Sequence, residues 1–146
     1  MNKYIHSKIY KISSPQTDKI YIGSTCKELY ERLSKHKNHY RDYLNGKQKY
    51  ITSYEIIKFS DCIIELIEKV NCDNKKDLLI REGYYIRLYK NNVVNKYIAG
   101  RTRNEYKKQI KNCLCGSKYT LRHKARHLRT KKHIMNMQEN IIIDIN

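Results

Sequence analysis

The stretch that decides the fold is YIHSKIYKISSPQTDKIYIG, residues 4–23. Apolar and polar side chains alternate well enough over residues 4–12 and 19–23 to predict two β-strands. The six residues between these runs include Pro15 and Asp18, which are typical of a turn. The pattern therefore predicts an N-terminal β-hairpin.

If the hairpin loop covers residues 13–18, Ile12 pairs with Lys19 and Tyr10 pairs with Tyr21. In that register the two phenol rings lie side by side on one face of the sheet. A phenol beside a metal-bound water can hydrogen-bond that water, or accept its proton if the pKa of the phenol is lowered. Lys19, on the same strand face as Tyr21, is predicted to supply the field that lowers this pKa.

Helical and extended patterns alternate in the rest of the first 100 residues. A stripe of side chains at about 100° per residue predicts a helix from Lys27 to about Asn45, with Gly46 as its end. Intermixed strands and helices predict an α+β fold whose domain ends near residue 100. The later predicted elements are a short helix capped by Ser53, a buried strand over 62–70, a long helix over 75–90 and an irregular segment over 91–100.

Glu82 is the most informative residue of the second long helix. A buried carboxylate loses several kcal/mol of hydration unless it meets a cation. Either a Lys or Arg pairs with Glu82, or the carboxylate binds Mg²⁺, which prefers oxygen ligands; the position favours the metal ligand. A second apolar stripe leaves the inward direction of the helix open. The stripe around Glu82 is Leu78, Leu79, Tyr85, Ile86 and Tyr89, and the second is Ile80, Tyr84 and Leu88.

Arg32 and His36 lie one turn apart at the border of the apolar stripe of the first long helix. From such a border a guanidinium can reach over the sheet and bind phosphate oxygens through two parallel hydrogen bonds. Taken alone, each residue is more often a solvated Arg or a structural His. Their significance depends on their order with the two tyrosines and Glu82.

That order resembles the GIY-YIG endonuclease family. Within residues 4–98, five features follow one another in the family's order: KIY at 8–10, a YIG tyrosine eleven residues later, GST at 23–25, the Arg–His pair and Arg81-Glu82. The resemblance implies a small mixed sheet of three strands flanked by helices, and single-metal hydrolysis of DNA phosphodiester bonds with water as nucleophile. The first glycine of the family's triplet is Lys8 here, at a position that serves the backbone rather than the chemistry.

Carried over by position, the resemblance implies a metal-dependent enzyme with Mg²⁺ or Mn²⁺ at its active site. His36 matches a histidine that only part of the family has, and Asn95 falls where the family has a structural or supporting asparagine. The catalytic positions implied are Tyr10, Tyr21, Arg32 and Glu82, with Glu82 as the metal ligand.

The net charge of the 146-residue chain is +17, with 31 Lys and Arg against 14 Asp and Glu. Residues 101–133 contain 12 of these basic residues and one acidic residue, Glu105. This local excess is more than solubility requires, and it favours a nucleic acid as partner over a membrane or an acidic protein.

Thiols and imidazoles lie within this basic region. Cys113 and Cys115 are followed by His123, His127 and His133. The spacing is close to that of a C-x₂₋₄-C, H-x₃₋₅-H zinc finger, with one residue fewer in each of the first two intervals. The pattern favours Cys113, Cys115, His127 and His133 as ligands of Zn²⁺, and a set with His123 in place of His133 stays open.

This module resembles the short zinc-finger-like tails of some GIY-YIG proteins from large DNA viruses. The other three cysteines, in a chain without a secretion signal, are predicted to be reduced residues in or near the core: Cys26, Cys62 and Cys72. Six basic side chains around the zinc ligands are predicted to form a cationic helix that contacts nucleic acid: Arg122, Lys124, Arg126, Arg129, Lys131 and Lys132.

The principal hypothesis is a DNA endonuclease targeted by a basic zinc-binding tail; the alternative is a non-catalytic nucleic-acid-binding protein that has the zinc module. We expect a soluble, intracellular protein with no membrane partner and no small-molecule substrate, because no apolar run is long enough to span a membrane. Its richness in Ile, Asn and Lys fits a viral or mobile-element origin in a host cell. The predicted segments are a nuclease domain (1–100), a basic linker (101–112), a zinc module (113–137) and a tail (138–146).

Overall fold

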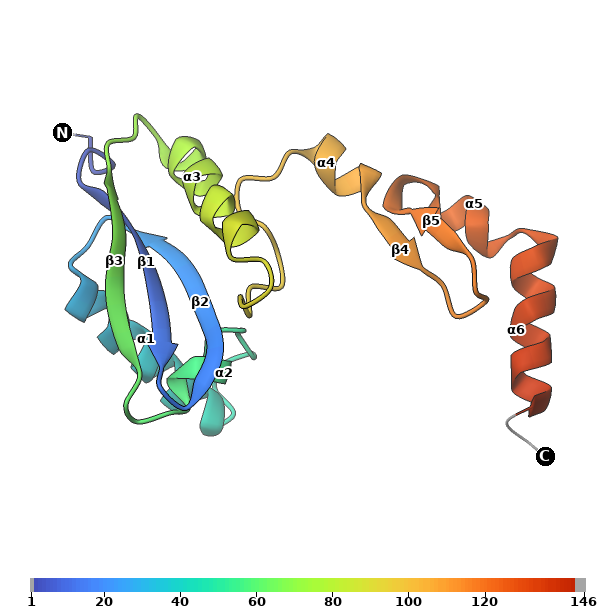
Figure 1. The fold of residues 1–146 in the computed structure, drawn as a ribbon, viewed down its shortest axis with the longest axis horizontal. Helices are drawn as coiled ribbons and strands as arrows, with labels where there is room; N and C mark the ends of the chain where they lie inside the picture. The colour runs from blue at the N-terminus through green and yellow to red at the C-terminus, as the bar shows by residue number, and fades with distance from the viewer. Residues whose placement is uncertain (1, 144–146) are drawn as a thin grey trace. The chain divides into compact units, whose positions relative to one another are not determined.

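The structure, a computed structural model, describes residues 2–143, with side chains described as far as Gln138. The chain forms two compact units, residues 1–100 and 101–146, and each is described by itself (Figure 1). The mixture of strands and helices in the first unit confirms the predicted α+β fold. Its elements are β1 (Ser7–Ser14), β2 (Thr17–Thr25), α1 (Leu29–Leu44), α2 (Tyr54–Ile57), β3 (Ile63–Val70) and α3 (Lys75–Leu88).

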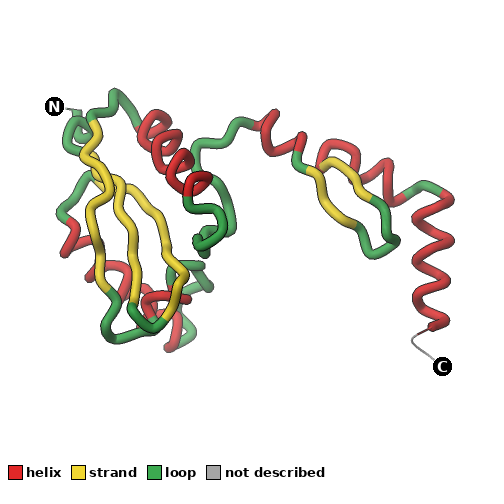
Figure 2. The backbone as a smooth tube through the Cα atoms, viewed as in Figure 1, coloured by secondary structure: helices red, strands yellow, loops and turns green. Residues whose placement is uncertain are grey.

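The strands form one sheet in the order β2-β1-β3, and both strand pairs are antiparallel (Figure 2). Among the described residues, parallel pairing is limited to a bridge between Ile20 and Val93. The backbone of Ile20 also bonds that of Asn92 and Val94, at 2.9 Å in each case. The segment after α3 is therefore held against the outer edge of β2.

The β1–β2 hairpin is tighter than predicted. Ser14 pairs with Thr17, so two residues connect the strands. Tyr10 lies opposite Gly23 rather than Tyr21, and the predicted register was wrong by two residues. Because side chains alternate along a strand with a period of two, this shift keeps both tyrosines on one face. Their ring centroids are 6.4 Å apart.

Helices cover both faces of the sheet (Figure 1). On one face, Ile9 and Ile22 pack against Leu78 and Ile86 of α3. On the other face, α1 and α2 cover Tyr10 and its neighbours. Tyr10 is fully buried, so a phenol forms part of the core of the unit.

β3 was predicted to be a buried strand, but it is an edge strand with exposed apolar side chains. Ile63 is 51% exposed and Leu66 is 42% exposed. Ile64 and Ile67 pack on opposite faces of the sheet, each against one helical layer. A short apolar run is compatible with either position, because pairing order is not encoded in its hydropathy.

The first long helix ends as predicted and the short one does not begin as predicted. α1 ends before Gly46, which adopts a φ of +72° and donates its N–H to the carbonyl of Tyr43. Ser53 precedes α2 but does not cap it. Its hydroxyl lies instead against His36 of α1.

The inward face of α3 is the one that contains Glu82. Leu78 and Ile86, one turn to either side of Glu82, are buried. Asn74 caps the helix by accepting hydrogen bonds from two backbone N–H groups. The competing stripe is exposed: Ile80, Tyr84 and Leu88.

The second unit is a small hairpin followed by helices. α4 and β4 lie within the range predicted to be a basic linker, and α4 begins with a capping box between Thr102 and Glu105. No helix in the described part of the chain has the length and apolar character that crossing a membrane requires. The elements are α4 (Arg103–Lys108), β4 (Ile110–Asn112), β5 (Lys118–Thr120), the 3₁₀ helix η1 (Leu121–His123), α5 (Lys124–Leu128) and α6 (Lys131–Ile143).

Candidate active site and metal centre

A chain of hydrogen bonds links α1, β1 and the start of α2. Arg32 Nε donates to the hydroxyl of Tyr10 at 2.8 Å. That hydroxyl lies 2.9 Å from Nε2 of His36, and His36 Nδ1 lies 3.2 Å from Oγ of Ser53. Arg32 and His36 converge on Tyr10 because residues four apart share one face of a helix.

Burial and the roles of donors and acceptors determine where the protons lie in this hydrogen-bond network. Tyr10 is 0% exposed and His36 is 5% exposed. Since Arg32 can only donate, we assign His36 Nε2 as the acceptor of the Tyr10 proton and Nδ1–H as the donor to Ser53. Burial raises the pKa of Tyr10 above its ordinary value. Burial and the positive charge of Arg32 lower the pKa of His36 to about 3, so its imidazole is neutral.

Tyr21 lies beside Tyr10 as a second neutral phenol. Burial and the nearby carboxylate of Glu82 raise the pKa of Tyr21 to about 12, and Arg32 opposes this rise. The prediction that Lys19 lowers this pKa was wrong, because Lys19 is exposed and burial of the phenol dominates. At neutral pH both phenols are therefore hydrogen-bonding groups rather than bases.

The Glu82 carboxylate lies between α3 and β2. Its Oε2 accepts a hydrogen bond from Ser24 Oγ at 2.5 Å. Burial raises the pKa of Glu82, and the bond from Ser24 and the charge of Arg32 act in the opposite direction. None of the ion pairs among the described residues includes Glu82. The carboxylate is therefore not neutralised by a Lys or Arg in contact with it.

Gly23, Ser24 and Ser53 also shape the site, although none of them was predicted to be a site residue. A Cβ at Gly23 would overlap the hydroxyl of Tyr10, its cross-strand partner. Gly23 thus leaves the space in which that hydroxyl meets Arg32. A glycine inside a strand is a sign of such close approach, and this signal was available in the YIG triplet. The two serines gave no comparable signal.

Asn95 fixes the chain next to Glu82. Its Nδ2 donates to the carbonyl oxygen of Ile22 at 2.8 Å, and its Oδ1 accepts from the Ile22 N–H at 2.9 Å. This pair of bonds satisfies the outer edge of β2 where an additional strand would otherwise pair. Asn95 therefore holds the segment after α3 beside the site.

Two pockets open beside these residues. One, of about 480 Å³, is lined in part by Tyr21, Glu82 and Asn95. The other, of about 530 Å³, is lined in part by Arg32 and the basic side chains of Lys27 and Lys35. The carboxylate and the guanidinium can thus be approached from solvent on two sides.

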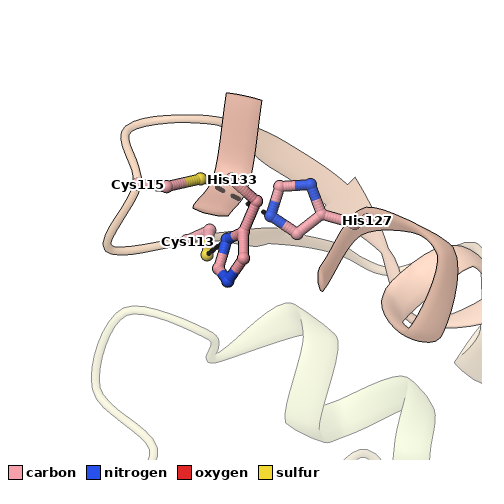
Figure 3. Close-up of side chains that lie close together, drawn as sticks. All are labelled: Cys113, Cys115, His127 and His133. Atoms are coloured by element: carbon pink, nitrogen blue, oxygen red, sulfur yellow. Dashed lines mark hydrogen bonds between the residues drawn. The ribbon is translucent and has the colours of Figure 1, made fainter. Parts of the chain in front are cut away.

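In the second unit, two thiols and two imidazoles form a cluster (Figure 3). The ligand atoms of Cys113, Cys115, His127 and His133 all lie within 4.8 Å of one another. Cys113 Sγ is 3.4 Å from His133 Nδ1, and Cys115 Sγ is 3.5 Å from His127 Nε2. His123 is outside the cluster, since its Nδ1 lies 3.0 Å from the hydroxyl of Thr120. The geometry therefore selects the ligand set with His133.

The hairpin between β4 and β5 explains how the short spacing between the two cysteines is accommodated. Gly116, with a φ of +79°, donates its N–H to the carbonyl of Cys113. Cys115 is buried, and its carbonyl accepts a hydrogen bond from Asn136 of α6 at 2.9 Å. Burial acts to raise the pKa of the Cys115 thiol, but the neighbouring polar groups, first the His133 imidazole and then Ser117 and Cys113, lower it to about 6. The turn and α6 thus bring both thiols toward the imidazoles.

The basic side chains predicted to contact nucleic acid are all exposed, but they do not form one helix. His127 lies on α5 and His133 on α6, and two residues outside any helix, Arg129 and Thr130, form a break between these helices. The six side chains are distributed over η1, α5, the break and α6: Arg122, Lys124, Arg126, Arg129, Lys131 and Lys132.

Comparisons with known proteins identify the first unit. A family model described as the GIY-YIG catalytic domain matches residues 6–98, more than half of the chain. Two similar solved structures are the catalytic domain of the intron endonuclease I-TevI in mutant form and that of the homing endonuclease I-TevI. The first is 24% identical in sequence with a TM-score of 0.46, and the match covers 66% of this chain and 97% of that structure's chain. The second is 23% identical with a TM-score of 0.46, and the match covers 62% of this chain and 98% of that structure's chain. No curated protein matches the chain. The match to the family model shows that this chain belongs to the GIY-YIG family and has the catalytic domain of an endonuclease.

Proposed function

We propose that this chain is a DNA endonuclease that hydrolyses phosphodiester bonds with a divalent metal ion at Glu82. The observation that carries the proposal is a largely buried carboxylate without an ion-pair partner among the described residues, beside two phenols and a guanidinium. GIY-YIG nucleases use a divalent metal, and an endonuclease domain implies a DNA substrate. The network around Tyr10 supplies the positioning that such a reaction needs.

The residues present fit Mg²⁺ or Mn²⁺. Glu82 offers a carboxylate whose Oε2 is oriented by Ser24, in a pocket large enough for the ion's waters. When bound there, the metal polarises a phosphate oxygen and lowers the pKa of a coordinated water. Because burial raises the pKa of Glu82, a cation bound at its carboxylate would also favour the ionised form that binds the cation.

Arg32 acts on the phosphate. Its one hydrogen bond among the described residues uses Nε, which leaves its two Nη groups available to a phosphate. A guanidinium can stabilise the charge that develops on the phosphate oxygens as water adds to phosphorus and one P–O bond breaks. The Tyr10 hydroxyl, itself bonded to neutral His36, fixes the orientation of that guanidinium.

Tyr21 is a hydrogen-bonding group for the attacking water or a phosphate oxygen. It shares the pocket with Glu82 and remains protonated at neutral pH. A protonated phenol can donate one hydrogen bond and accept another. Asn95 supports this arrangement because it fixes Ile22, the residue that follows Tyr21.

The second unit is proposed to bind Zn²⁺ and to attach the nuclease domain to DNA. Two thiols and two imidazoles within 4.8 Å of one another are the donor set of a structural zinc site. A unit this small has little apolar core, so a metal supplies folding free energy. The exposed basic side chains of residues 122–132 then face the phosphate backbone.

Replacement of Glu82 by Gln tests the catalytic proposal. We expect the variant to lose Mg²⁺-dependent cleavage of plasmid DNA and to retain its fold and DNA binding, because the amide keeps the shape but not the charge. In metal-free buffer its melting temperature should equal or exceed that of the wild type, since a buried charge is removed. The matched control is Asp73→Asn, at an exposed carboxylate on the loop before α3. Near-normal cleavage by the Glu82 variant would remove Glu82 from the reaction.

A further inference from the structure

The pocket beside Glu82 extends beyond the groups that the reaction uses. Besides Tyr21, Glu82 and Asn95, which are partly buried, its lining includes three exposed residues. These are Tyr50, Lys96 and Tyr97, and we call the part of the pocket that they line the outer pocket. The outer residues come from two segments far apart in the sequence, the loop after α1 and the loop after α3. Neither Tyr50 nor Tyr97 has a part in the chemistry proposed above.

Tyr50 is exposed yet held in place. The side chain is 52% exposed, and its hydroxyl donates to Glu55 Oε1 at 2.8 Å. Its ring is perpendicular to that of Tyr54, with centroids 5.9 Å apart, and Tyr54 is itself 2% exposed. An aromatic side chain fixed in this way loses little conformational entropy when a ligand stacks on it.

Tyr97 is the second exposed ring of the outer pocket. It is 63% exposed, and Lys96 Nζ lies 5.6 Å from its ring centroid. The backbone around it is fixed, because Asn95 is clamped to Ile22 and Ile98 packs on the core. The outer pocket therefore combines two positioned aromatic rings with a cation.

We propose that the outer pocket receives an unstacked nucleobase of the strand being cut, with Tyr50 and Tyr97 as its stacking partners. Aromatic side chains beside a positive charge are the features by which proteins hold single-stranded nucleic acid, since every base has a π-face. The whole pocket, of about 480 Å³, lies within the roughly 300–1,000 Å³ typical of small-ligand pockets. Because the same pocket contains Glu82, the scissile phosphate and the base belong to neighbouring nucleotides.

This inference rests on the proposed nuclease function and names its substrate class. A base inside an intact duplex is stacked on both faces, so it reaches the two tyrosines only if it is unpaired or extruded. The preferred substrate is therefore DNA with an unpaired nucleotide, such as a bulge or a single-stranded end, at the cleavage point. Lys96 contacts the phosphate that flanks the extruded base.

Equilibrium binding without added Mg²⁺ or Mn²⁺, and without a chelator that would remove Zn²⁺ from the second unit, tests the proposal without cleavage. Two fluorescent probes are compared: a fully paired duplex, and the same duplex with one bulged 2-aminopurine. The full-length wild type should bind the bulged duplex at least about fivefold more tightly, the lower end of what base–aromatic stacking contributes. Its binding should also quench 2-aminopurine fluorescence. Equal affinity for the two duplexes would overturn the proposal.

Substitutions test whether the preference for the bulged duplex depends on the rings of Tyr50 and Tyr97. Tyr50→Ala and Tyr97→Ala should each remove most of the preference and of the quenching, whereas Tyr50→Phe, which keeps the ring, should retain both. Tyr84→Ala is the matched control, because Tyr84 is 48% exposed and does not line this pocket. Equal losses of affinity for both duplexes in the alanine variants would also overturn the proposal, since the tyrosines would then be general DNA contacts.

Cleavage of both the paired and the bulged duplex with Mg²⁺ separates this inference from the proposed function. Failure of the wild type to cut any DNA would refute the nuclease proposal, whatever the binding result. Efficient metal-dependent cutting with no preference for the bulge would refute only the base pocket. Melting curves for each variant confirm that the comparison is between folded proteins.

Discussion

Arg32 connects the buried network to the substrate. Nε is engaged by Tyr10, so the orientation of the guanidinium is set before any phosphate arrives. Such preorganised donors contribute mainly to the transition state, because they need not reorganise as charge develops. We expect phosphate affinity in the ground state to be shared with Lys27 and Lys35, because these residues line the same pocket as Arg32.

We therefore expect Arg32→Ala to reduce turnover far more than DNA affinity. The loss should be on the order of 3 kcal/mol in the single-turnover rate constant, or more than 100-fold, with only a small change in the dissociation constant. Lys27→Ala is the control, expected to weaken binding more than it slows cleavage. Equal losses of rate and affinity in the Arg32 variant would make this residue a phosphate anchor.

His36 makes the stability of the first unit depend on pH. The pKa of His36 is lowered to about 3 in the folded protein, whereas 6.5 is its ordinary value. Between these values the unfolded chain binds one proton more than the folded chain, so folding becomes less favourable as pH falls through this window. The neighbouring charges are those of Arg32, Lys35 and His39, all of which act to lower the pKa further.

His36→Gln should remove this dependence because a neutral amide does not titrate. The difference in unfolding free energy between the wild type and this variant should be constant above about pH 6.5. Below that pH it should fall by up to about 1.4 kcal/mol per pH unit. Urea unfolding at several pH values measures this, with His6→Gln, at an exposed histidine, as the control. A difference independent of pH between 4 and 7 would contradict the neutral buried imidazole.

The side chains of the site differ in how far they could be predicted. Glu82 was recognisable because a carboxylate on an apolar helical face is costly wherever that helix packs. Tyr10 and Tyr21 were placed on one face because strand alternation survives a shift of two residues. The direction of the Tyr21 pKa was mispredicted, because it depends on burial by α1 and on Glu82, which no strand pattern contains.

Among the secondary-structure elements, local patterns gave the type of element but not its pairing. The long helices and the strands of the first unit were predicted near their observed bounds, since each has its own periodicity, whereas β4 and β5 were not predicted. The position of β3 at the edge, and the break between α5 and α6, follow from tertiary packing. The hydroxyl of Ser53 likewise bonds His36 in preference to the N-terminus of α2. Such choices are decided by contacts distant in the sequence.

The outer edge of β2 depends on the segment after α3. Asn95→Ala should destabilise the first unit by about 1–3 kcal/mol, because two part-buried backbone groups of Ile22 lose their partners. Asn92→Ala is the matched control: its Nδ2 makes one exposed bond, to the carbonyl of Asp18 at 3.2 Å, and a smaller loss is expected. Denaturant unfolding gives both values, and hydrogen exchange at the Ile22 amide reports the local opening. Equal losses in the two variants would show that the clamp has no special role.

The two units divide the charge unequally. Residues 101–133 contain 12 of the 31 basic side chains and one acidic residue. The reaction centre, by contrast, is assembled within residues 10–95, and no side chain of the second unit is needed to form it. We therefore expect catalysis and electrostatic attachment to be separable, so that removal of the second unit affects the two activities differently.

A chain truncated after Gly100 should fold and cut DNA weakly, with a shallower dependence of affinity on salt. Each lost phosphate contact reduces the slope of log K against log salt by about 0.9. Metal analysis should give about one zinc per full-length chain and none in the truncated one. Cys115→Ala should reproduce the truncation, because a cluster with one thiol removed no longer holds the hairpin against α5 and α6. A full-length chain without zinc, or a truncated chain with undiminished affinity and an unchanged salt slope, would contradict this division and leave residues 101–143 with no part in binding DNA.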